Sequence, residues 1–384
     1  MGKAIRMVGL CLAFVLAAST GHGAEAIKLG AFFDLTGTSA AIGTPTKLVA
    51  EMVVKKINDE GGINGRPLQL VIADDEGDPT KAAIIARKFT ESDKVTAIIG
   101  PTRTDTGMAA KPVVEQMKVP TFMTVGGDAP IVVPPFKYTF KSPQRTTVAV
   151  QKTYSYLKKK GMQKVAIITA ADGFGKDGKA ALEKLAPEFG ITLVMAESFQ
   201  ATDKDMTAQL IKIKAANPDA IICWTIGAAG AIVAKNVKQL AIKAPLFQCH
   251  GLPDPVYVQL AGDASDGNIM PSTKLMVASQ LPNSDPQKKV ITEFVRLYND
   301  VYHYDRQFPI NTHSGYAWDA IYMVANAMKK AGTDNEKLRD AIEQTKGYVG
   351  VSGTYTITPE DHNGLGIDSM VMVQVSKGQW KLLE

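Results

Sequence analysis

Short runs of β-branched and aliphatic residues alternate with amphipathic stretches along most of this chain, and this alternation limits the folds open to it. Ile27–Phe33 is typical of a buried strand, and Ile42–Glu60 is typical of a helix with apolar positions at Leu48, Met52 and Ile57. The pattern continues with expected strands at Leu68–Ala73, Val95–Gly100, Val165–Ala170, Thr192–Phe199 and Ala220–Trp224, and expected helices at Pro79–Ser92, Lys176–Phe189 and Met206–Ala216. Strands that alternate with helices form parallel sheets covered on both faces. We therefore expect an α/β fold whose ligands bind beyond the carboxyl ends of the strands.

The predicted elements fall into two modules, one before and one after the polar, proline-bounded segment Phe136–Pro143. A chain of 384 residues is also too long for one compact core. Further crossings between the modules are expected near Asn268–Thr273 and Ser352–Pro359. The expected organisation is two doubly wound parallel-sheet lobes joined by a multi-segment hinge, with residues 27–141 plus 274–353 in lobe 1 and residues 142–273 plus 354–384 in lobe 2.

The N-terminus has the features of a secretory signal peptide over residues 1–26. Lys3 and Arg6 supply positive charge, Val8–Ala18 is an apolar core, and Ala24-Glu25-Ala26 offers a small-residue cleavage site. The apolar core is too short for a stable membrane span, and no other stretch approaches the required length of about 18 apolar residues. We therefore expect a periplasmic protein, exported across the cytoplasmic membrane.

Charge and motif content exclude several classes of function. The chain has 43 basic and 38 acidic residues, dispersed among one another, so it has no basic stripe for nucleic acid. It contains neither an HExxH helix motif nor a GxSxG nucleophile elbow. No CxxC or Cys/His metal spacing is present. We expect no enzyme activity, no metal and no cofactor.

Two cysteines follow the expected signal peptide, and each ends an apolar run. Cys223 ends DAIIC and Cys249 ends PLFQC. They could lie on neighbouring strands and form a disulfide in an oxidising compartment, or they could remain buried free thiols. The sequence leaves both alternatives open.

Gly173–Gly178 reads GFGKDG, which matches the GxGxxG pattern of dinucleotide-binding turns, and it lies between a predicted strand and a predicted helix. However, Ala171 and Asp172 separate the strand from the first glycine, whereas a pyrophosphate-binding turn places that glycine at the strand end. We therefore do not expect a nucleotide site here.

A series of distinctive blocks runs along the sequence, and the most diagnostic is INDEGGINGRPLQLVIADDEGDPTKA at Ile57–Ala82. The others include IKLGAFFDLTGTSAAIG at Ile27–Gly43, VTAIIGPTRTDT at Val95–Thr106, VPTFMTVGGDAP at Val119–Pro130, KVAIITAADGFGKDG at Lys164–Gly178 and APLFQCHG at Ala244–Gly251. In this order the blocks resemble the branched-chain amino-acid-type periplasmic binding proteins of ABC transporters, which have the type I fold. The resemblance implies a monomeric protein that captures a small-molecule ligand between two lobes and delivers it to an ABC transporter permease. A ligand-sensing role toward a membrane receptor is the alternative.

The resemblance also implies which residues contact the ligand. In the family, hydroxyls and backbone N–H groups at helix N-termini of the first lobe hold the ligand carboxylate. The matching positions here are Thr102, Arg103, Thr104, Gly127 and Asp128.

The remaining expected contacts form the walls of the pocket and its second-lobe side. Ile42, Phe174 and Trp224 would supply apolar and aromatic walls. The family usually meets the ligand ammonium with a second-lobe carboxylate, and this chain has His250 at that position. Two explanations stay open. Asp128 takes over the ammonium of an amino acid, or the ligand is an organic acid without an ammonium, aromatic acids included, that Arg103 and His250 bind.

Overall fold

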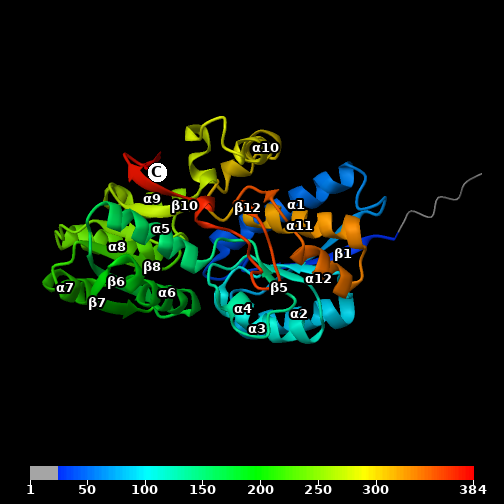
Figure 1. The fold of residues 1–384 in the computed structure, drawn as a ribbon, viewed down its shortest axis with the longest axis horizontal. Coiled ribbons are helices and arrows are strands. Elements are labelled where there is room, and N and C mark those ends of the chain that lie inside the picture. The colour runs from blue at the N-terminus through cyan, green and yellow to red at the C-terminus, as the bar shows by residue number, and fades with distance from the viewer. Residues whose placement is uncertain (1–24) are drawn as a thin grey trace, which may run out of the picture.

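The first of the two large sheets in the computed structural model, which describes residues 25–384, has five parallel strands in the order β2-β1-β3-β4-β5. It forms the core of the first lobe, on the right in Figure 1. Its strands are β1 (Ile27–Phe33), β2 (Leu68–Asp74), β3 (Ala97–Ile99), β4 (Thr121–Met123) and β5 (Thr139–Lys141). Its helices are α1 (Ala40–Asp59), α2 (Pro79–Arg87), α3 (Thr104–Gln116), α4 (Ala129–Val132), α11 (Tyr316–Ala331) and α12 (Asn335–Glu343).

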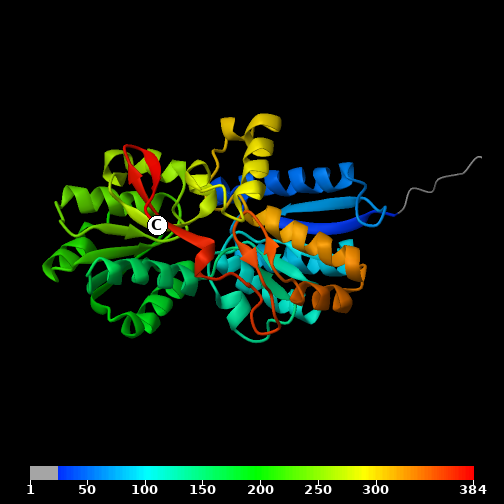
Figure 2. The same ribbon diagram turned by 45° about the horizontal axis from the view of Figure 1, so that its top comes forward.

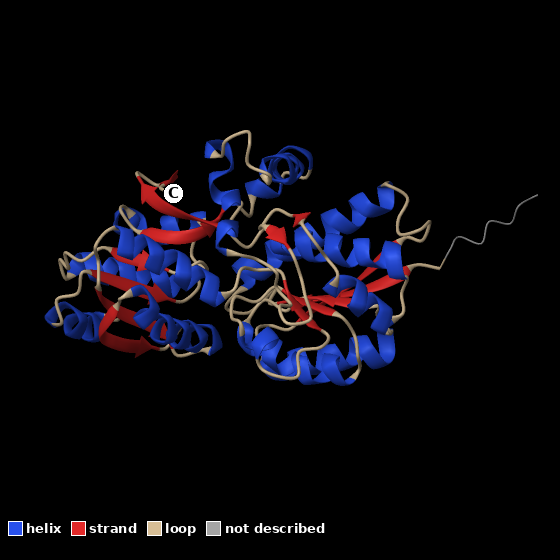
Figure 3. Ribbon diagram, viewed as in Figure 1, coloured by secondary structure: helices blue, strands red, loops and turns tan. Residues whose placement is uncertain are grey.

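Helices cover both faces of this first sheet, as Figure 3 shows. Strand β1 explains the layering, because its side chains alternate between the two faces. Leu29 and Ala31 are buried in the cluster that includes α1 and α11, whereas Phe32 packs in a second cluster with Ala82 of α2 and Val114 of α3. Both faces are therefore apolar, as expected for a parallel sheet.

The second sheet has seven strands in the order β14-β13-β10-β9-β8-β6-β7, within the described residues. Its strands are β6 (Lys164–Ala170), β7 (Thr192–Phe199), β8 (Ala220–Trp224), β9 (Leu246–Gln248), β10 (Ile269–Thr273), β13 (Met370–Ser376) and β14 (Gln379–Leu382). The helices of this lobe are α5 (Thr146–Lys159), α6 (Gly173–Phe189), α7 (Thr207–Ala215), α8 (Ala228–Gln239) and α9 (Pro255–Ala261). Strands β6 to β10 run parallel, and β13 and β14 complete the sheet in antiparallel pairing.

The chain crosses between the lobes at several places along residues 25–384. It passes from β5 to α5, from β10 towards α10 (Lys288–Arg296), and from the hairpin β11 (Tyr348–Val349) and β12 (Thr354–Tyr355) towards β13. Figure 2 shows these crossings side by side between the lobes. Hydrogen bonds tie the first and third crossings together: the hydroxyl of Tyr355 donates to the carbonyl of Ser142 at 2.6 Å, and the amide of Gln144 donates to the carbonyl of Ser352 at 2.5 Å. The amide of Gln287 links the second crossing to the third by donating to the carbonyl of Val351 at 3.0 Å.

Some segments differ from the sequence-based expectation. The expected linker Phe136–Pro143 contains β5, and Asn268–Thr273 contains β10, so both belong to sheets. Thr354–Asn363, expected in lobe 2, packs on the first lobe, where β12 pairs with β11 and the His362 ring stacks on Phe140 at 4.2 Å. Lys274–Gln280, expected in lobe 1, lies against the second sheet, where Gln280 donates to the carbonyl of Trp380 at 2.8 Å. Composition does not reveal which sheet edge a short connecting segment covers.

The expected signal peptide, residues 1–26, lies almost entirely outside the described residues. Of the helices in residues 25–384, none combines the length and the hydropathy needed to cross a membrane.

Candidate functional site

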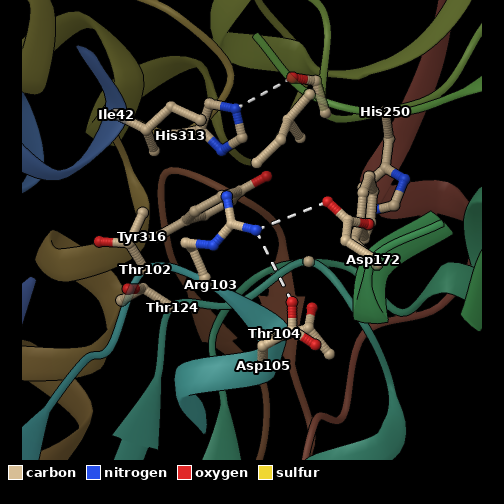
Figure 4. Close-up of a pocket in the computed structure, with 14 residues that line it drawn as sticks. Ile42, Thr102, Arg103, Thr104, Asp105, Thr124, Asp172, His250, His313 and Tyr316 are labelled. Atoms are coloured by element: carbon tan, nitrogen blue, oxygen red, sulfur yellow. Dashed lines mark hydrogen bonds and ion pairs between the residues drawn. The ribbon is translucent and has the colours of Figure 1, made fainter. Parts of the chain in front are cut away.

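A small cavity of about 20 Å³ lies where the two lobes face each other (Figure 4). Its walls come from α1, from the loops that follow β3 and β4 in the first lobe, and from the loops that follow β6, β8 and β9 in the second. Parallel sheets bind ligands at this edge, beyond the carboxyl ends of their strands. The lining residues are Ile42, Thr102, Arg103, Thr104, Asp105, Thr124, Gly126, Asp172, Phe174, Ile226, His250, Gly251, His313 and Tyr316.

The first-lobe wall is built around the N-terminus of α3. Thr104 accepts a hydrogen bond from the N–H of Gly127 at 3.1 Å, and Thr102 accepts one from the N–H of Asp34 at 3.2 Å. Arg103 occupies the N-cap position, and no described side chain caps the helix. The partial positive charge of this helix end is therefore available to an anion in the cavity.

Arg103 reaches across the cavity to the second lobe. Its Nη2 lies 3.6 Å from Oδ2 of Asp172 and 3.7 Å from Oδ2 of Asp105, while Nη1 donates to the hydroxyls of Thr38 and Ser39 at 3.2 and 3.1 Å. The Arg103 and Asp172 side chains are 16% and 14% exposed, whereas Asp105 is 38% exposed. The cavity thus holds one cation and one well-shielded carboxylate from opposite lobes.

Asp172 also explains why the GxGxxG pattern makes no nucleotide site. Its Oδ1 accepts a hydrogen bond from the N–H of Gly175 at 2.8 Å and so caps helix α6. A phosphate would need this helix end, where a carboxylate already lies.

His250, Phe174 and Trp224 form an aromatic cluster on the second-lobe side. Their ring centroids lie 5.4 to 5.8 Å apart. Phe174 and His250 line the cavity, whereas Trp224 is fully buried behind them against Gly178. Burial and the nearby charge of Lys141 lower the pKa of His250 to about 3, so its imidazole is neutral at physiological pH.

His313 lines the opposite side of the same cavity. Burial lowers its pKa to about 4. Its Nε2 lies 3.1 Å from the carbonyl of Gly251 and donates to it, because a carbonyl can only accept. This contact fixes the tautomer and leaves Nδ1 as an acceptor.

Asp128 and Gly127 differ from the expectation, because neither lines the cavity among the residues described. The two carboxylate oxygens of Asp128 are used within the protein: they lie 3.0 Å from Lys141 and 3.6 Å from Arg145, and they accept hydrogen bonds from the N–H groups of Thr146 and Thr147. Burial raises the pKa of Asp128, but the two cations outweigh it and hold the pKa below its usual value. Asp128 is therefore a poor candidate for an ammonium in the cavity.

The structure thus brings Ile42, Thr102, Arg103, Thr104, Phe174 and His250 together around one cavity and leaves Gly127, Asp128 and Trp224 behind it. Sequence reasoning missed Asp172 and Ile226, although each follows the end of a predicted strand, and the strand pattern could have found them. It also missed Gly251, which follows the three-residue strand β9, and Tyr316, which is 3% exposed and lines the cavity. The burial of Tyr316 alone does not distinguish a core residue from a cavity residue.

Two further expectations concern metals and disulfides. Within residues 25–384 no group of three or more His, Cys, Asp or Glu side chains is placed to hold a metal ion. Cys223 and Cys249 are both free and buried, and the thiol of Cys249 lies 3.0 Å from the carbonyl of Thr225.

The cavity continues into a wider cleft of about 380 Å³, and the two share Ile42, Arg103, Asp172, Ile226 and Gly251. Beyond these shared residues the cleft is lined largely by apolar side chains, including Leu252, Val256, Tyr257 and Leu260. Arg103 and Asp172 therefore line both the cavity and the cleft.

Comparison with known proteins supports the family resemblance. A model of the periplasmic binding protein family matches residues 26–379. The chain is 25% identical over 331 residues to the leucine-, isoleucine-, valine-, threonine- and alanine-binding protein of Pseudomonas aeruginosa, covering 85% of this chain and 84% of that protein.

Solved structures share the same fold. An extracellular ligand-binding receptor from Rhodopseudomonas palustris HaA2 superposes with a TM-score of 0.85 at 26% identity, covering 94% of this chain and all of that one. The LivJ substrate-binding protein of Streptococcus pneumoniae, solved with isoleucine, gives a TM-score of 0.80 at 23% identity over 93% of this chain and 99% of that one. These relatives are binding proteins rather than enzymes. The chain therefore belongs to the periplasmic binding protein family, in its branched-chain amino-acid type.

Proposed function

We propose that this protein binds a small zwitterionic solute, an amino acid, in the periplasm and delivers it to the permease of an ABC transporter. The carrying observation is that Arg103 and Asp172, from opposite lobes, line one cavity 3.6 Å apart. The names of the amino-acid-binding relatives support this class of ligand.

The charge balance of the cavity favours a zwitterion over a simple organic acid. Arg103 pairs with Asp172 and with the more exposed Asp105, so a ligand carboxylate that pairs with Arg103 would leave Asp172, the better shielded carboxylate, without its partner. Removing one member of a largely buried pair costs about 3–5 kcal/mol, and less where water reaches the pair. An ammonium on the same ligand would pair with Asp172 and avoid this cost. The ion pair between Arg103 and Asp172 is then replaced by two ion pairs between the protein and the ligand.

The same geometry couples binding to closure. The ligand carboxylate would contact Arg103 and the N-terminus of α3 in the first lobe, and its ammonium would contact Asp172 in the second. Both contacts exist together only when the lobes are closed, so the ligand shifts the population to the closed form. A shift from 1:99 to 99:1 needs about 5.5 kcal/mol of differential binding.

Closure requires rigid lobes with a hinge between them. We propose that residues 27–141 and 288–363 form one lobe, that residues 146–280 and 370–384 form the other, and that the remaining described segments between them form the hinge. The permease would recognise the closed surface. The same lobes could report to a membrane receptor, and permease and ATPase genes beside this one would support transport.

The test measures binding of matched ligands to the mature protein by calorimetry. The series contains L-amino acids and, for each, the acid without its amino group and the amine without its carboxyl group. We expect an amino acid to bind and each truncated analogue to bind at least about 100-fold more weakly. Equal or tighter binding of the deaminated acid would replace this proposal with an organic-acid transporter.

Variants assign the two charges. Arg103→Ala and Asp172→Asn should each weaken amino-acid binding by about 100-fold or more. The matched control is Asp263→Asn, which alters an exposed ion pair with Lys238 far from the cavity. Unchanged affinity in Arg103→Ala would make this arginine a structural residue.

A further inference from the structure

His250 holds two unused hydrogen-bonding atoms at the cavity wall. Its side chain is 2% exposed, and neither Nδ1 nor Nε2 has a hydrogen-bond partner among the described residues. The backbone of Gly126 approaches the ring, but no hydrogen bond of normal geometry joins them. Buried polar atoms of native proteins nearly always have partners, so an unpartnered pair at a binding cavity points to a group supplied from outside.

The surroundings of the ring limit what that group can be. Phe174 and Trp224 pack edge-on against the imidazole at 5.5 and 5.4 Å, so two aromatic side chains cover the ring. Lys141 is the cation that most lowers the pKa of the ring, and its charge is already matched by Asp128. Arg103 and Asp172 would be taken by the two charges common to all amino acids, so a further charged group beside His250 would have no free counter-ion.

A neutral imidazole offers one donor and one acceptor. A hydroxyl and a carboxamide can each donate or accept, so either can pair with whichever nitrogen faces the cavity. An aliphatic group can do neither and would leave the imidazole unpaired in the closed protein.

We propose that the bound amino acid has a side chain with a neutral hydrogen-bonding group, a hydroxyl or a carboxamide, that pairs with His250. This inference rests on the proposed function, and it separates the ligand from purely aliphatic amino acids. His250 is then a specificity-determining residue, because it selects the side chain while Arg103 and Asp172 hold the two charges common to all amino acids.

The experiment compares amino acids of similar shape in pairs: threonine with valine, asparagine with leucine, and tyrosine with phenylalanine. Affinities are measured by calorimetry on the mature protein. We expect the polar member to bind about 10-fold or more tightly in at least one pair, because a site built for a hydrogen bond rejects the analogue that lacks it.

Each outcome decides a different claim. If no amino acid binds, the proposed function fails. If amino acids bind but the apolar member is preferred or equal in every pair, the proposed function stands and this inference is overturned. A water molecule that permanently satisfies the imidazole would give that second result.

Variants test the assignment to His250. His250→Leu should remove the preference for the polar member, whereas His250→Gln, which keeps a donor and an acceptor, should retain most of it. His303→Gln is the matched control, since His303 lies on the surface and contacts only the local carbonyl of Asn299. If His250→Leu folds and keeps the polar preference, the side chain of the ligand is read elsewhere.

Discussion

Nη2 of Arg103, on the first lobe, lies 3.6 Å from Oδ2 of Asp172, on the second lobe. Both side chains are largely shielded, so water screens this pair less than a surface pair. Because the two residues lie on opposite lobes, we expect this pair to favour closure before any solute arrives. We also expect the solute to separate the pair when it binds.

Replacing Asp172 with asparagine should open the ligand-free protein. The ion pair across the cavity is lost, so the open form gains population and the radius of gyration measured by small-angle scattering should increase. Asp263→Asn should leave the curve unchanged, because its exposed partner Lys238 lies on the same lobe. Identical curves for Asp172→Asn and the unmodified protein would show that this pair does not hold the lobes together.

Gly126→Ala should weaken solute binding without unfolding either lobe. A Cβ atom at Gly126, on the first lobe, would lie 2.6 Å from the ring of Phe174 on the second, so the lobes could not approach as closely. We expect a loss of about 10-fold or more in affinity and little change in melting temperature. Adding Phe174→Leu should recover part of the lost closure, because leucine lacks the clashing ring atoms. A double-mutant cycle measures this coupling.

Lys141→Met should strongly destabilise the fold. Lys141 is fully buried, its Nζ donates to the carbonyls of Gly126 and Gln144, and it lies 3.0 Å from Asp128. Without Lys141, the buried carboxylate of Asp128 keeps only the more distant Arg145 as a cationic partner. We expect this loss to lower the free energy of unfolding by about 3–5 kcal/mol.

Chemical denaturation checks the Lys141 prediction. Adding Asp128→Asn to Lys141→Met should recover part of the loss by removing the buried charge. The control Lys118→Ala, at an exposed pair with Glu336, should have no measurable effect. If Lys141→Met has the same free energy of unfolding as the unmodified protein, the pair of Lys141 and Asp128 does not have the stabilising role assigned to it.

Stability should depend on pH through His250. Burial, together with the charge of Lys141, lowers the folded-state pKa to about 3, against about 6.5 in the unfolded chain. Asp128 opposes this lowering, and His313 adds to it only once protonated. Between these two pKa values the unfolded chain binds the extra proton, so stability rises as pH rises from about 3 to about 6.5 and then levels off.

His250→Gln should reduce this rise. The rise in stability due to His250 is at most about 1.4 kcal/mol for each unit of difference between its folded and unfolded pKa values. The difference between the variant and the unmodified protein separates this rise from the contribution of His313. Denaturant melts across pH 3.5–7 provide the measurement. Parallel stability curves would mean that the imidazole is not shielded as the structure places it.

The alternation of strands and helices was sufficient to predict the two parallel sheets, because apolar periodicity depends on local burial. Strands Ile27–Phe33 and Ala220–Trp224 coincide with prediction to the residue. Strands β4 and β9 are only three residues long and carry no periodicity, so the alternation pattern did not predict them. The packing of Thr354–Asn363 on the first sheet and of Lys274–Gln280 on the second was unpredictable for the same reason, since packing partners decide where such segments lie.

The site was less predictable than the fold. Arg103 and His250 were identified through the family resemblance, and both line the cavity. The resemblance pointed to Asp128 in the same way, yet its carboxylate pairs with Lys141 and Arg145. No sequence motif marks these two cations as its partners. Asp172 directly precedes the GxGxxG pattern at Gly173–Gly178, which directed attention to a nucleotide site rather than to this carboxylate. Which carboxylate of several remains free is decided by tertiary pairing.

The order of strands in the second sheet has a consequence for how the protein is made. Strand β13 joins this sheet between β10 and β14, about a hundred residues after β10 and after the chain has returned to the first lobe to form α11 and α12. Neither lobe can complete its fold before nearly the whole polypeptide has left the ribosome. Such late completion is compatible with the proposed periplasmic location, for which the chain would cross the membrane before it folds.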